Sequence, residues 1–326
     1  MIHFSSSPLR VSIIGGGTDF RSFYTKHNGA VISFTIDKYV NVLVKNKFDK
    51  GIKLSYSLNE YPKSVNKIKH SIIKNIFKLY DIKNNIELIS IADIHSKGTG
   101  LGSSSAFTLA TIAAINSFLK QKSLNKKKIA ELACYIEIDK NKSPIGEQDQ
   151  YASSFGGFNF IDFKKKGVSV NKYNFNKNHL KHIQKNLFLY NTGISRSANS
   201  ILHLHKKKIK EKSDIDYLKY LRDETYILNE QLINKNFDYI PISINKSWEL
   251  KKKFNFKTKN KLIDKLIKKG IDNGASAAKL LGAGGGGFIL FYVNNKKIKN
   301  FIQNMGRGNF LDFNFSDDGI KSRQLL

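Results

Sequence analysis

A chain of 326 residues is long enough for two hydrophobic cores of ordinary size, so we expect two lobes. A hydrophobic content of 40%, with 12% aromatic residues, excludes wholesale disorder, and the single cysteine, Cys134, excludes an internal disulfide and favours a reducing compartment. The formal net charge of +29 would suit a nucleic-acid-binding protein, but the lysines are spread along the whole chain without a recognisable nucleic-acid-binding motif, so we interpret them as solvated surface residues.

The first part of the chain mixes strand and helix patterns. Alternating apolar and polar residues, rich in β-branched side chains, predict strands at 2–14, 30–46, 52–57, 86–92, 158–163 and 168–173. Apolar residues at helical spacing predict helices at 64–80, 104–119 and 126–139. Together these elements predict an α+β N-terminal lobe, which we place at residues 1–180.

The second part begins with a strand predicted at 186–191 and is then mostly helical. Helices are predicted at 196–212, 214–234, 245–253 and 259–273. A strongly apolar strand, 288–293, follows a run of glycines. We therefore expect a C-terminal lobe of helices on a small sheet, residues 181–326.

A glycine-rich turn leads directly into the helix predicted at 104–119. The run from Lys97 to Ala106 reads Lys-Gly-Thr-Gly-Leu-Gly-Ser-Ser-Ser-Ala. Its glycines can adopt positive φ and approach a ligand closely, and the start of the helix would direct free N–H groups at an anion. A tight turn with an ordinary serine N-cap is the alternative, but a cap needs only one hydroxyl. We interpret the run as a phosphate-binding loop, although it matches neither a Walker loop nor a dinucleotide fingerprint.

A second glycine cluster, Gly282 to Gly287, precedes the strand at 288–293. Five of its six residues are glycine. A tight turn into a buried strand needs only one or two, so the surplus favours close approach of the backbone to a ligand.

Three acidic residues stand out along the chain. Glu137 falls on or beside the apolar face of the helix predicted at 126–139, where a carboxylate needs either a Lys or Arg partner or a metal such as Mg²⁺. Asp149 lies in a polar loop and could simply cap the turn 150–154. Asp19 follows the Gly15-Gly16-Gly17 turn, where it too could act as a cap.

Four segments, around residues 19, 104, 149 and 285, resemble the GHMP kinases, whose N-terminal, central and C-terminal motifs run in this order. The resemblance extends over nearly the whole chain. Within the family the chain resembles most the sugar kinases that phosphorylate D-glycero-D-manno-heptose 7-phosphate at its anomeric oxygen. The stretches that carry this likeness are 15–20, 148–157, 190–197, 248–252 and 279–288. The resemblance implies a two-lobed fold with the active site in a cleft between the lobes.

The resemblance also implies the roles of individual residues. The ATP phosphates would be bound by Gly98, Gly100, Leu101, Gly102, Ser103, Ser104 and Ser105. Mg²⁺ would be held by Ser104 and Glu137, and the catalytic residues would be Asp149 and Arg10. The substrate would be bound by Gly16, Gly17, Thr18, Asp19, Gln150, Thr192, Arg196, Gly284, Gly285 and Gly286. Two positions depart from the pattern: Ser96 replaces a usual proline, and Glu147 replaces a basic residue common in the heptose branch.

The expected partners are ATP, Mg²⁺ and a sugar phosphate. We expect binding neither to nucleic acid nor to a membrane, and a homodimer is left open. The chain lacks a basic leader and any run of about 18 apolar residues, so a cytoplasmic enzyme is expected, serving nucleotide-activated heptose for surface polysaccharide. Two alternatives stay open at this point. The acceptor could be an unphosphorylated sugar such as L-fucose, or the chain could be a basic nucleic-acid-binding protein.

Overall fold

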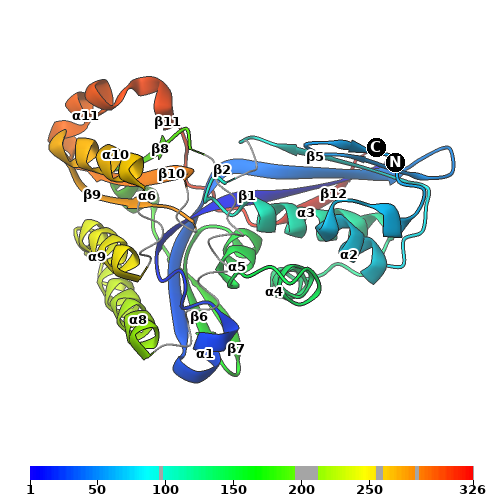
Figure 1. Ribbon diagram of the computed structural model, residues 1–326, viewed down its shortest axis with the longest axis horizontal. Coiled ribbons are helices and arrows are strands. Elements are labelled where there is room, and N and C mark those ends of the chain that lie inside the picture. The colour runs from blue at the N-terminus through cyan, green and yellow to red at the C-terminus, as the bar shows by residue number, and fades with distance from the viewer. Residues whose placement is uncertain (95–97, 195–211, 255–259, 283–285, 326) are drawn as a thin grey trace.

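The chain folds into two lobes that each contain a β-sheet (Figure 1). The computed structural model describes residues 1–94, 98–194, 212–254, 260–282 and 286–325. Helices and strands are mixed in both lobes, which confirms the α+β class predicted from the sequence. None of the helices within these ranges is both long and apolar enough to cross a bilayer.

Eight strands of the described residues form the large sheet, which defines the large-sheet lobe. In pairing order its main path is β12 (Lys321–Leu325), β1 (Ile2–Ile14), β2 (Gly29–Asn46), β5 (Ile86–Ala92), β3 (Ile52–Ser55) and β4 (Asn59–Glu60). The other half of β2 pairs with β6 (Phe158–Lys164), and β6 pairs with β7 (Gly167–Lys172). All these pairs are antiparallel except β3 with β5.

The long strand β1 changes its burial pattern along its length. Residues 2–6 alternate between buried and partly exposed, as expected for a sheet with one face in solvent. From residue 7 to 14 every side chain is buried, because helices pack on one face and the other lobe closes the far end. The functional segments follow this buried end of β1.

Helices α2 (Ser71–Leu79), α3 (Ser103–Phe118), α4 (Lys126–Cys134) and α5 (Gln148–Phe155) cover one face of the large sheet (Figure 1). The central helix, α3, packs against β1, β2 and three neighbouring helices, and its sequence is apolar on nearly all sides. A helix that is hydrophobic all round is stable only when it is enclosed by protein. The start of α3 is therefore held at a fixed place in the molecule.

The small-sheet lobe contains four strands in the order β11 (Phe310–Leu311), β8 (Leu187–Asn191), β10 (Phe288–Val293) and β9 (Ala275–Leu280). Helices α10 (Lys261–Asp272) and α11 (Ile298–Met305) pack on it and share a core with β10. Every residue of β10 is buried, as its uninterrupted apolar sequence predicts. Gly270 of α10 lies so close to Phe291 that a side chain there would meet the ring at 2.2 Å.

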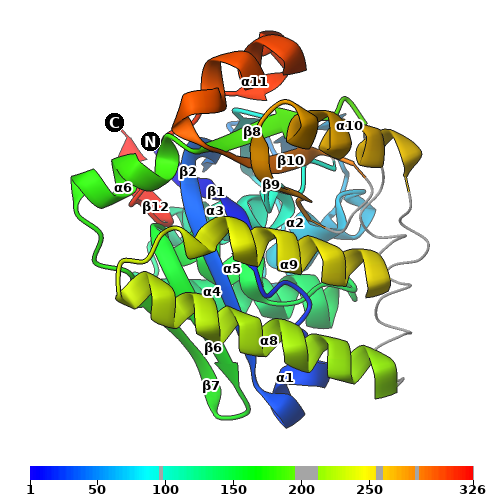
Figure 2. The same ribbon diagram turned by 90° about the vertical axis from the view of Figure 1, so that its left-hand side faces the viewer.

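Two long helices connect the lobes. Helices α8 (Lys212–Ile233) and α9 (Tyr239–Phe254) lie side by side, as Figure 2 shows. Helix α8 contacts β2 of the large sheet, whereas α9 contacts both β9 and β1. Helix α9 therefore faces the buried end of β1 from the other lobe. Two shorter helices, α1 (Arg21–His27) and α6 (Lys177–Gln184), follow β1 and precede β8.

The structure confirms most predicted strands and corrects several helices. The helix predicted at 64–80 is regular only from Ser71, and the helix predicted at 126–139 ends as α4 at Cys134 and continues as a π-helical turn, Tyr135–Lys140. The sequence analysis did not predict helices α1, α5, α6 and α11 or strands β4, β9, β11 and β12, and it interpreted the segment that forms α5 as a polar loop. Nearly all of the helix predicted at 196–212 lies outside the described residues.

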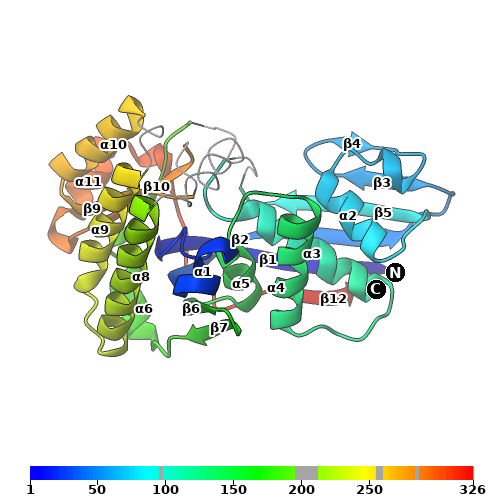
Figure 3. The same cartoon turned by 60° about the horizontal axis from the view of Figure 1, so that its bottom comes forward.

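The last strand joins the first lobe. Strand β12 pairs with β1 in the large sheet, and Figure 3 shows the N- and C-terminal strands next to each other. A segment expected in the C-terminal lobe therefore completes the edge of the N-terminal sheet. The lobe boundary near residue 180 stays a prediction.

Candidate active site

The loop before α3 has the backbone geometry that its glycines predict. Gly98, Gly100 and Gly102 have φ values of 72°, 76° and 77°, in the left-handed region that favours glycine. Gly102 is the N-cap of α3 and offers no side chain to the first turn, so the capping role considered for the serines is wrong. The N–H groups at the start of α3 are therefore directed outward without a side-chain cap, an arrangement that suits an anion.

The two glycine turns lie back to back. A side chain at Gly282 would meet the Cα of Gly100 at 2.5 Å, and one at Gly287 would meet the carbonyl oxygen of Gly98 at 2.4 Å. Packing between the turns thus explains part of the glycine surplus that the sequence analysis assigned to a ligand. Gly284 and Gly285, two of the predicted substrate residues, lie outside the described residues.

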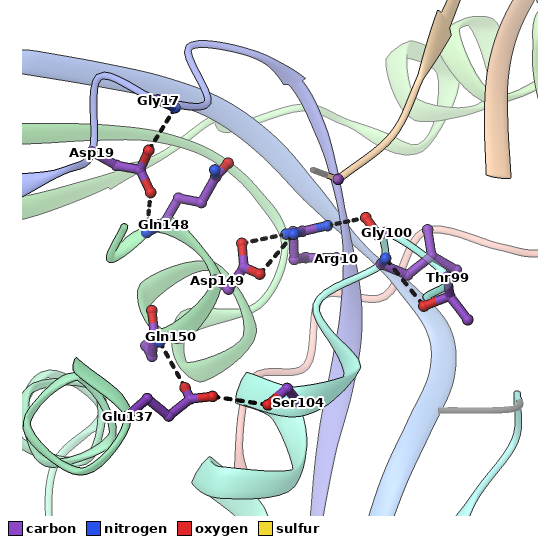
Figure 4. A network of polar contacts seen from close by, with 12 residues as sticks. Arg10, Gly17, Asp19, Thr99, Gly100, Ser104, Glu137, Gln148, Asp149 and Gln150 are labelled. Carbon is purple, nitrogen blue, oxygen red and sulfur yellow. Dashed lines mark hydrogen bonds and ion pairs between the residues drawn. The ribbon is translucent and has the colours of Figure 1, made fainter. Parts of the chain in front are cut away.

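Arg10 and Asp149 form a two-pronged ion pair at the centre of the site (Figure 4). Arg10 Nε donates to Asp149 Oδ1 at 2.8 Å and Nη2 donates to Oδ2 at 2.7 Å, while Nη1 donates to the carbonyl oxygen of Gly100 at 2.6 Å. Arg10 is buried in β1, and the Asp149 side chain keeps 24% of its surface exposed. Asp149 lies inside the first turn of α5 and does not cap a turn, which corrects the structural alternative considered above.

Glu137 is buried beside the start of α3 and has no cationic partner among the described residues. Its Oε1 accepts from Ser104 Oγ at 3.0 Å, and its Oε2 accepts from the Gln150 amide at 2.7 Å (Figure 4). Burial raises the pKa of Glu137 to about 7. Of the two partners considered from the sequence, a Lys or Arg is not observed in these ranges. The oxygen donors of Glu137 and the exposed Ser104 therefore suit Mg²⁺.

The π-helical turn explains how Glu137 reaches this position. Asn141 N–H donates to the carbonyl oxygen of Ile136, five residues earlier, which widens the helix at this point. An α-helical count places Glu137 on or beside the apolar face of the predicted helix. In the wider turn it is 1% exposed and faces α3 and α5.

Asp19 holds the first glycine turn against the start of α5. Its Oδ1 accepts from Gly17 N–H at 2.7 Å and its Oδ2 from Gln148 N–H at 3.0 Å. Burial raises the pKa of Asp19 to about 6. The Thr18 hydroxyl is fully buried, 2.8 Å from the carbonyl oxygen of Gly15. The predicted contacts of these residues with a sugar stay predictions, whereas Gly16 and Gly17 are accessible on the same turn.

The remaining predicted substrate residues are spread around the site. Gln150 is fully buried, and its amide donates to the Glu137 carboxylate. In the structure it therefore supports Glu137. Thr192 Oγ1 donates to the carbonyl oxygen of Gly287 at 2.8 Å, and Gly286 lies against Ile194. Thr192 therefore supports the second glycine turn from the end of β8, and Gly286 is part of that turn. Arg196 lies outside the described residues, as does Ser96.

The structure thus brings together segments that are far apart in the chain. Arg10, Gly100 and Asp149 are in direct contact, and Asp19 adjoins the residue before Asp149. Ser104, in the first turn of α3, contacts Glu137 of the π-helical turn beside them. A buried carboxylate and a partly exposed one, beside a helix start and two glycine turns, suit phosphoryl transfer.

Comparison with known proteins agrees with this geometry. The model of the GHMP kinases N terminal domain matches residues 65–157, and that of the GHMP kinases C terminal domain matches residues 228–310. A D-glycero-alpha-D-manno-heptose 7-phosphate kinase of Campylobacter jejuni is 32% identical over 98% of both chains. The chain belongs to the GHMP kinase family. It is an ATP-dependent sugar kinase, as the sequence predicts.

Solved structures show the same fold over the full length of this GHMP kinase. A putative sugar kinase from Campylobacter jejuni has a TM-score of 0.78 at 29% identity, covering 99% of this chain and 98% of that chain. A D-glycero-D-manno-heptose 1-phosphate kinase from Bacteroides thetaiotaomicron has a TM-score of 0.80 at 21% identity, covering both chains completely. At that identity the second likeness concerns the fold alone.

A second charge network, which the sequence analysis missed, connects α1 to the segments that carry Glu137 and Asp149. Arg21 of α1 pairs with Glu147 and, at 2.8 Å, with Asp139, and the Tyr24 hydroxyl donates to Glu147 at 3.2 Å. Asp139 lies two residues after Glu137, and Glu147 two residues before Asp149. Glu147 is buried and paired within the protein, so its substitution for a basic residue does not place an unpaired negative charge at the substrate.

We expect Arg21→Met to lower the free energy of unfolding by roughly 1–3 kcal/mol, because Glu147 then stays buried without its cation. Urea unfolding monitored by circular dichroism measures the change. In Arg21→Met/Glu147→Gln the loss should shrink, since the buried charge is removed as well. Lys268→Met, which breaks an exposed pair with Asp272 on α10, is the control and should change the value by less than about 0.5 kcal/mol. Equal losses in the two single variants would contradict this assignment.

Proposed function

We propose that this enzyme transfers the γ-phosphoryl group of ATP to the anomeric (C1) hydroxyl of D-glycero-D-manno-heptose 7-phosphate and forms the 1,7-bisphosphate. The observation that carries the proposal is the Arg10–Asp149 pair, which is fixed beside the uncapped start of α3. The full-length match to a heptose 7-phosphate kinase supports the acceptor. The product would supply nucleotide-activated heptose for surface polysaccharide in the cytoplasm.

Asp149 is proposed as the general base that accepts the proton of the attacking C1 hydroxyl. Its partly exposed carboxylate can reach a bound hydroxyl, and Arg10 orients it by donating to both oxygens. The C1 oxygen then forms a bond to the γ-phosphorus as the bond to the β,γ-bridging oxygen breaks. Positioning and charge stabilisation do most of this work, because phosphoryl transfer needs little covalent help from the protein.

The phosphate chain of ATP is proposed to lie along the loop from Gly98 to Ser105. The positive φ values at its glycines leave the backbone accessible, and the N–H groups at the start of α3 can donate to phosphate oxygens. The glycine turn at 282–287 would close on the same site from the other lobe, and the Gly16–Gly17 turn, with Asp19, would receive the sugar.

Ser104 and Glu137 are proposed to hold Mg²⁺ with the ATP phosphates. The fit rests on a buried carboxylate without a cationic partner in the described residues and on an exposed hydroxyl 3.0 Å from it. When bound, the ion would offset the negative charge that develops on the transferred group. Gln150 would keep the Glu137 carboxylate oriented through its amide hydrogen bond.

A screen of acceptors tests the proposed function. With ATP and Mg²⁺, we expect turnover on heptose 7-phosphate at least about tenfold faster than on unphosphorylated sugars such as L-fucose, since a missing phosphate removes charged contacts. A coupled assay of ADP release gives the rates, and phosphorus NMR identifies the position of the new phosphate. Faster turnover on a free sugar would establish the alternative acceptor, and phosphate on another oxygen would contradict C1 transfer.

Asp149→Asn is expected to lower kcat by about 10²–10⁴-fold, since the proton acceptor is lost, while the dissociation constant of ATP changes by less than about twofold. Steady-state kinetics and calorimetric titration measure the two quantities. Asp216→Asn, an exposed carboxylate on α8, serves as the control and should keep wild-type values. A folded Asp149→Asn enzyme with near wild-type turnover would remove Asp149 from this role.

Ser104→Ala and Glu137→Gln are both expected to raise the Mg²⁺ concentration needed for half-maximal activity, by about tenfold or more, because each removes an oxygen ligand. Activity is titrated with Mg²⁺ at saturating ATP. Ser117→Ala, at the far end of α3, is the matched control and should leave the titration unchanged. If both site variants titrate like the wild type, these residues are not metal ligands.

A further inference from the structure

Two lysines, one partly exposed and one buried, lie beside the second glycine turn and the end of β1. Lys251, on α9, donates from Nζ to the carbonyl oxygens of Leu280 at 3.0 Å and of Gly282 at 2.6 Å. Lys279, on the adjoining strand β9, donates to the carbonyl oxygen of Ile13 at 2.7 Å and contacts Ser247 Oγ at 3.2 Å. Both lie in stretches that carry the family likeness, 248–252 and 279–288, but the sequence analysis assigned neither a role.

Lys251 reaches the centre of the site through two backbone contacts. The carbonyl oxygen that it binds belongs to Gly282, whose Cα packs on Gly100. The carbonyl oxygen of Gly100 in turn accepts from Arg10 Nη1 at 2.6 Å. Only the two glycine turns therefore separate the Lys251 ammonium from the Arg10–Asp149 pair. The Lys251 residue is partly exposed, whereas Lys279 is buried, with 6% of its surface exposed.

Among the residues that the structure describes, no acid pairs with the two lysines. Within the described ranges neither lysine forms an ion pair, and the Asp149 carboxylate of the site already binds Arg10 with both oxygens. Burial, with a smaller effect of Arg10, lowers the pKa of Lys251 to about 8. Burial, followed by the charges of Lys251 and Arg10, lowers the pKa of Lys279 well below its usual value. Buried cations without acids are unfavourable, so the cluster favours an anionic ligand.

An ammonium group carries three N–H donors, and the two hydrogen bonds of Lys251 to described residues use two of them. Within the part of the chain that the structure describes, the third donor has no protein acceptor and can bind a ligand oxygen. The ring of Trp248 flanks the ammonium at 6.0 Å and limits the directions from which a ligand can approach. Lys279 of β9 donates to the carbonyl oxygen of Ile13 at the end of β1. This hydrogen bond joins the two lobes next to the Lys251 ammonium.

We propose that Lys251 binds the oxygens of a phosphate group in the reactive complex, which makes it a further binding residue of the active site. The proposal rests on the proposed function, in which two phosphate monoesters meet. The ligand is therefore either the terminal phosphate of ATP or the acceptor's own phosphate. A purely structural role, in which Lys251 only ties the glycine turn to α9, is the alternative outcome.

Calorimetric titrations of Lys251→Gln separate these sources. If the lysine binds the terminal phosphate, affinity for ATP with Mg²⁺ should fall about 10- to 100-fold while affinity for ADP changes less than about twofold. If it binds the acceptor's phosphate, heptose 7-phosphate should lose a similar factor while the same heptose without phosphate does not. Lys251→Arg should restore part of the loss, because it keeps the charge. Lys252→Gln, its exposed neighbour on α9, is the matched control.

Equal weakening of ATP and ADP, with no selective loss for the phosphorylated sugar, would overturn the proposal, since a structural defect acts on all ligands alike. Affinities within twofold of the wild type for every ligand would overturn it as well. A wild-type enzyme that does not bind or use heptose 7-phosphate refutes the proposed acceptor, and the comparison of ATP with ADP then decides the role of Lys251 alone. Thermal melting of each variant verifies that it is folded.

Discussion

The bidentate contact between Arg10 and Asp149 is the interaction on which the site depends. It joins strand β1 to helix α5, and the third arm of the guanidinium holds the carbonyl oxygen of Gly100 in the loop before α3. A planar guanidinium can bind these three acceptors in one fixed geometry, which a lysine cannot do. Because Arg10 is buried at the end of β1, the large sheet sets the position of the whole arrangement.

Charge is separated across the site. Glu137 and Asp19 lie buried on the side of the large sheet without cations among the described residues, and their raised pKa values express the unfavourable burial of their charge. Lys251 and Lys279 lie on the side of the small sheet without acids within the same ranges. Burying such charges without partners of opposite sign is unfavourable. A metal ion on one side and phosphate on the other would compensate both.

The two glycine turns limit how the lobes can meet. Gly282 contacts Gly100 at a distance that excludes any side chain, so the second turn can sit only against the loop that precedes α3. Their contact brings α9 and β9 to the buried end of β1. Sequence reasoning assigned all the surplus glycines to a ligand, because a sequence does not show that one glycine turn is packed on another.

The sequence by itself determined the motifs, the start of α3 and the long strands β1 and β2, because glycine conformation and hydrophobic periodicity are local properties. It also determined the family through these motifs. The tertiary structure alone decided that Asp149 pairs with Arg10, 139 residues away, that Glu137 lies in a π-helical turn against Ser104 and Gln150, and that β12 completes the first sheet. It alone brought the buried lysines to the site, because burial and charge pairing depend on contacts between distant segments that no local pattern encodes.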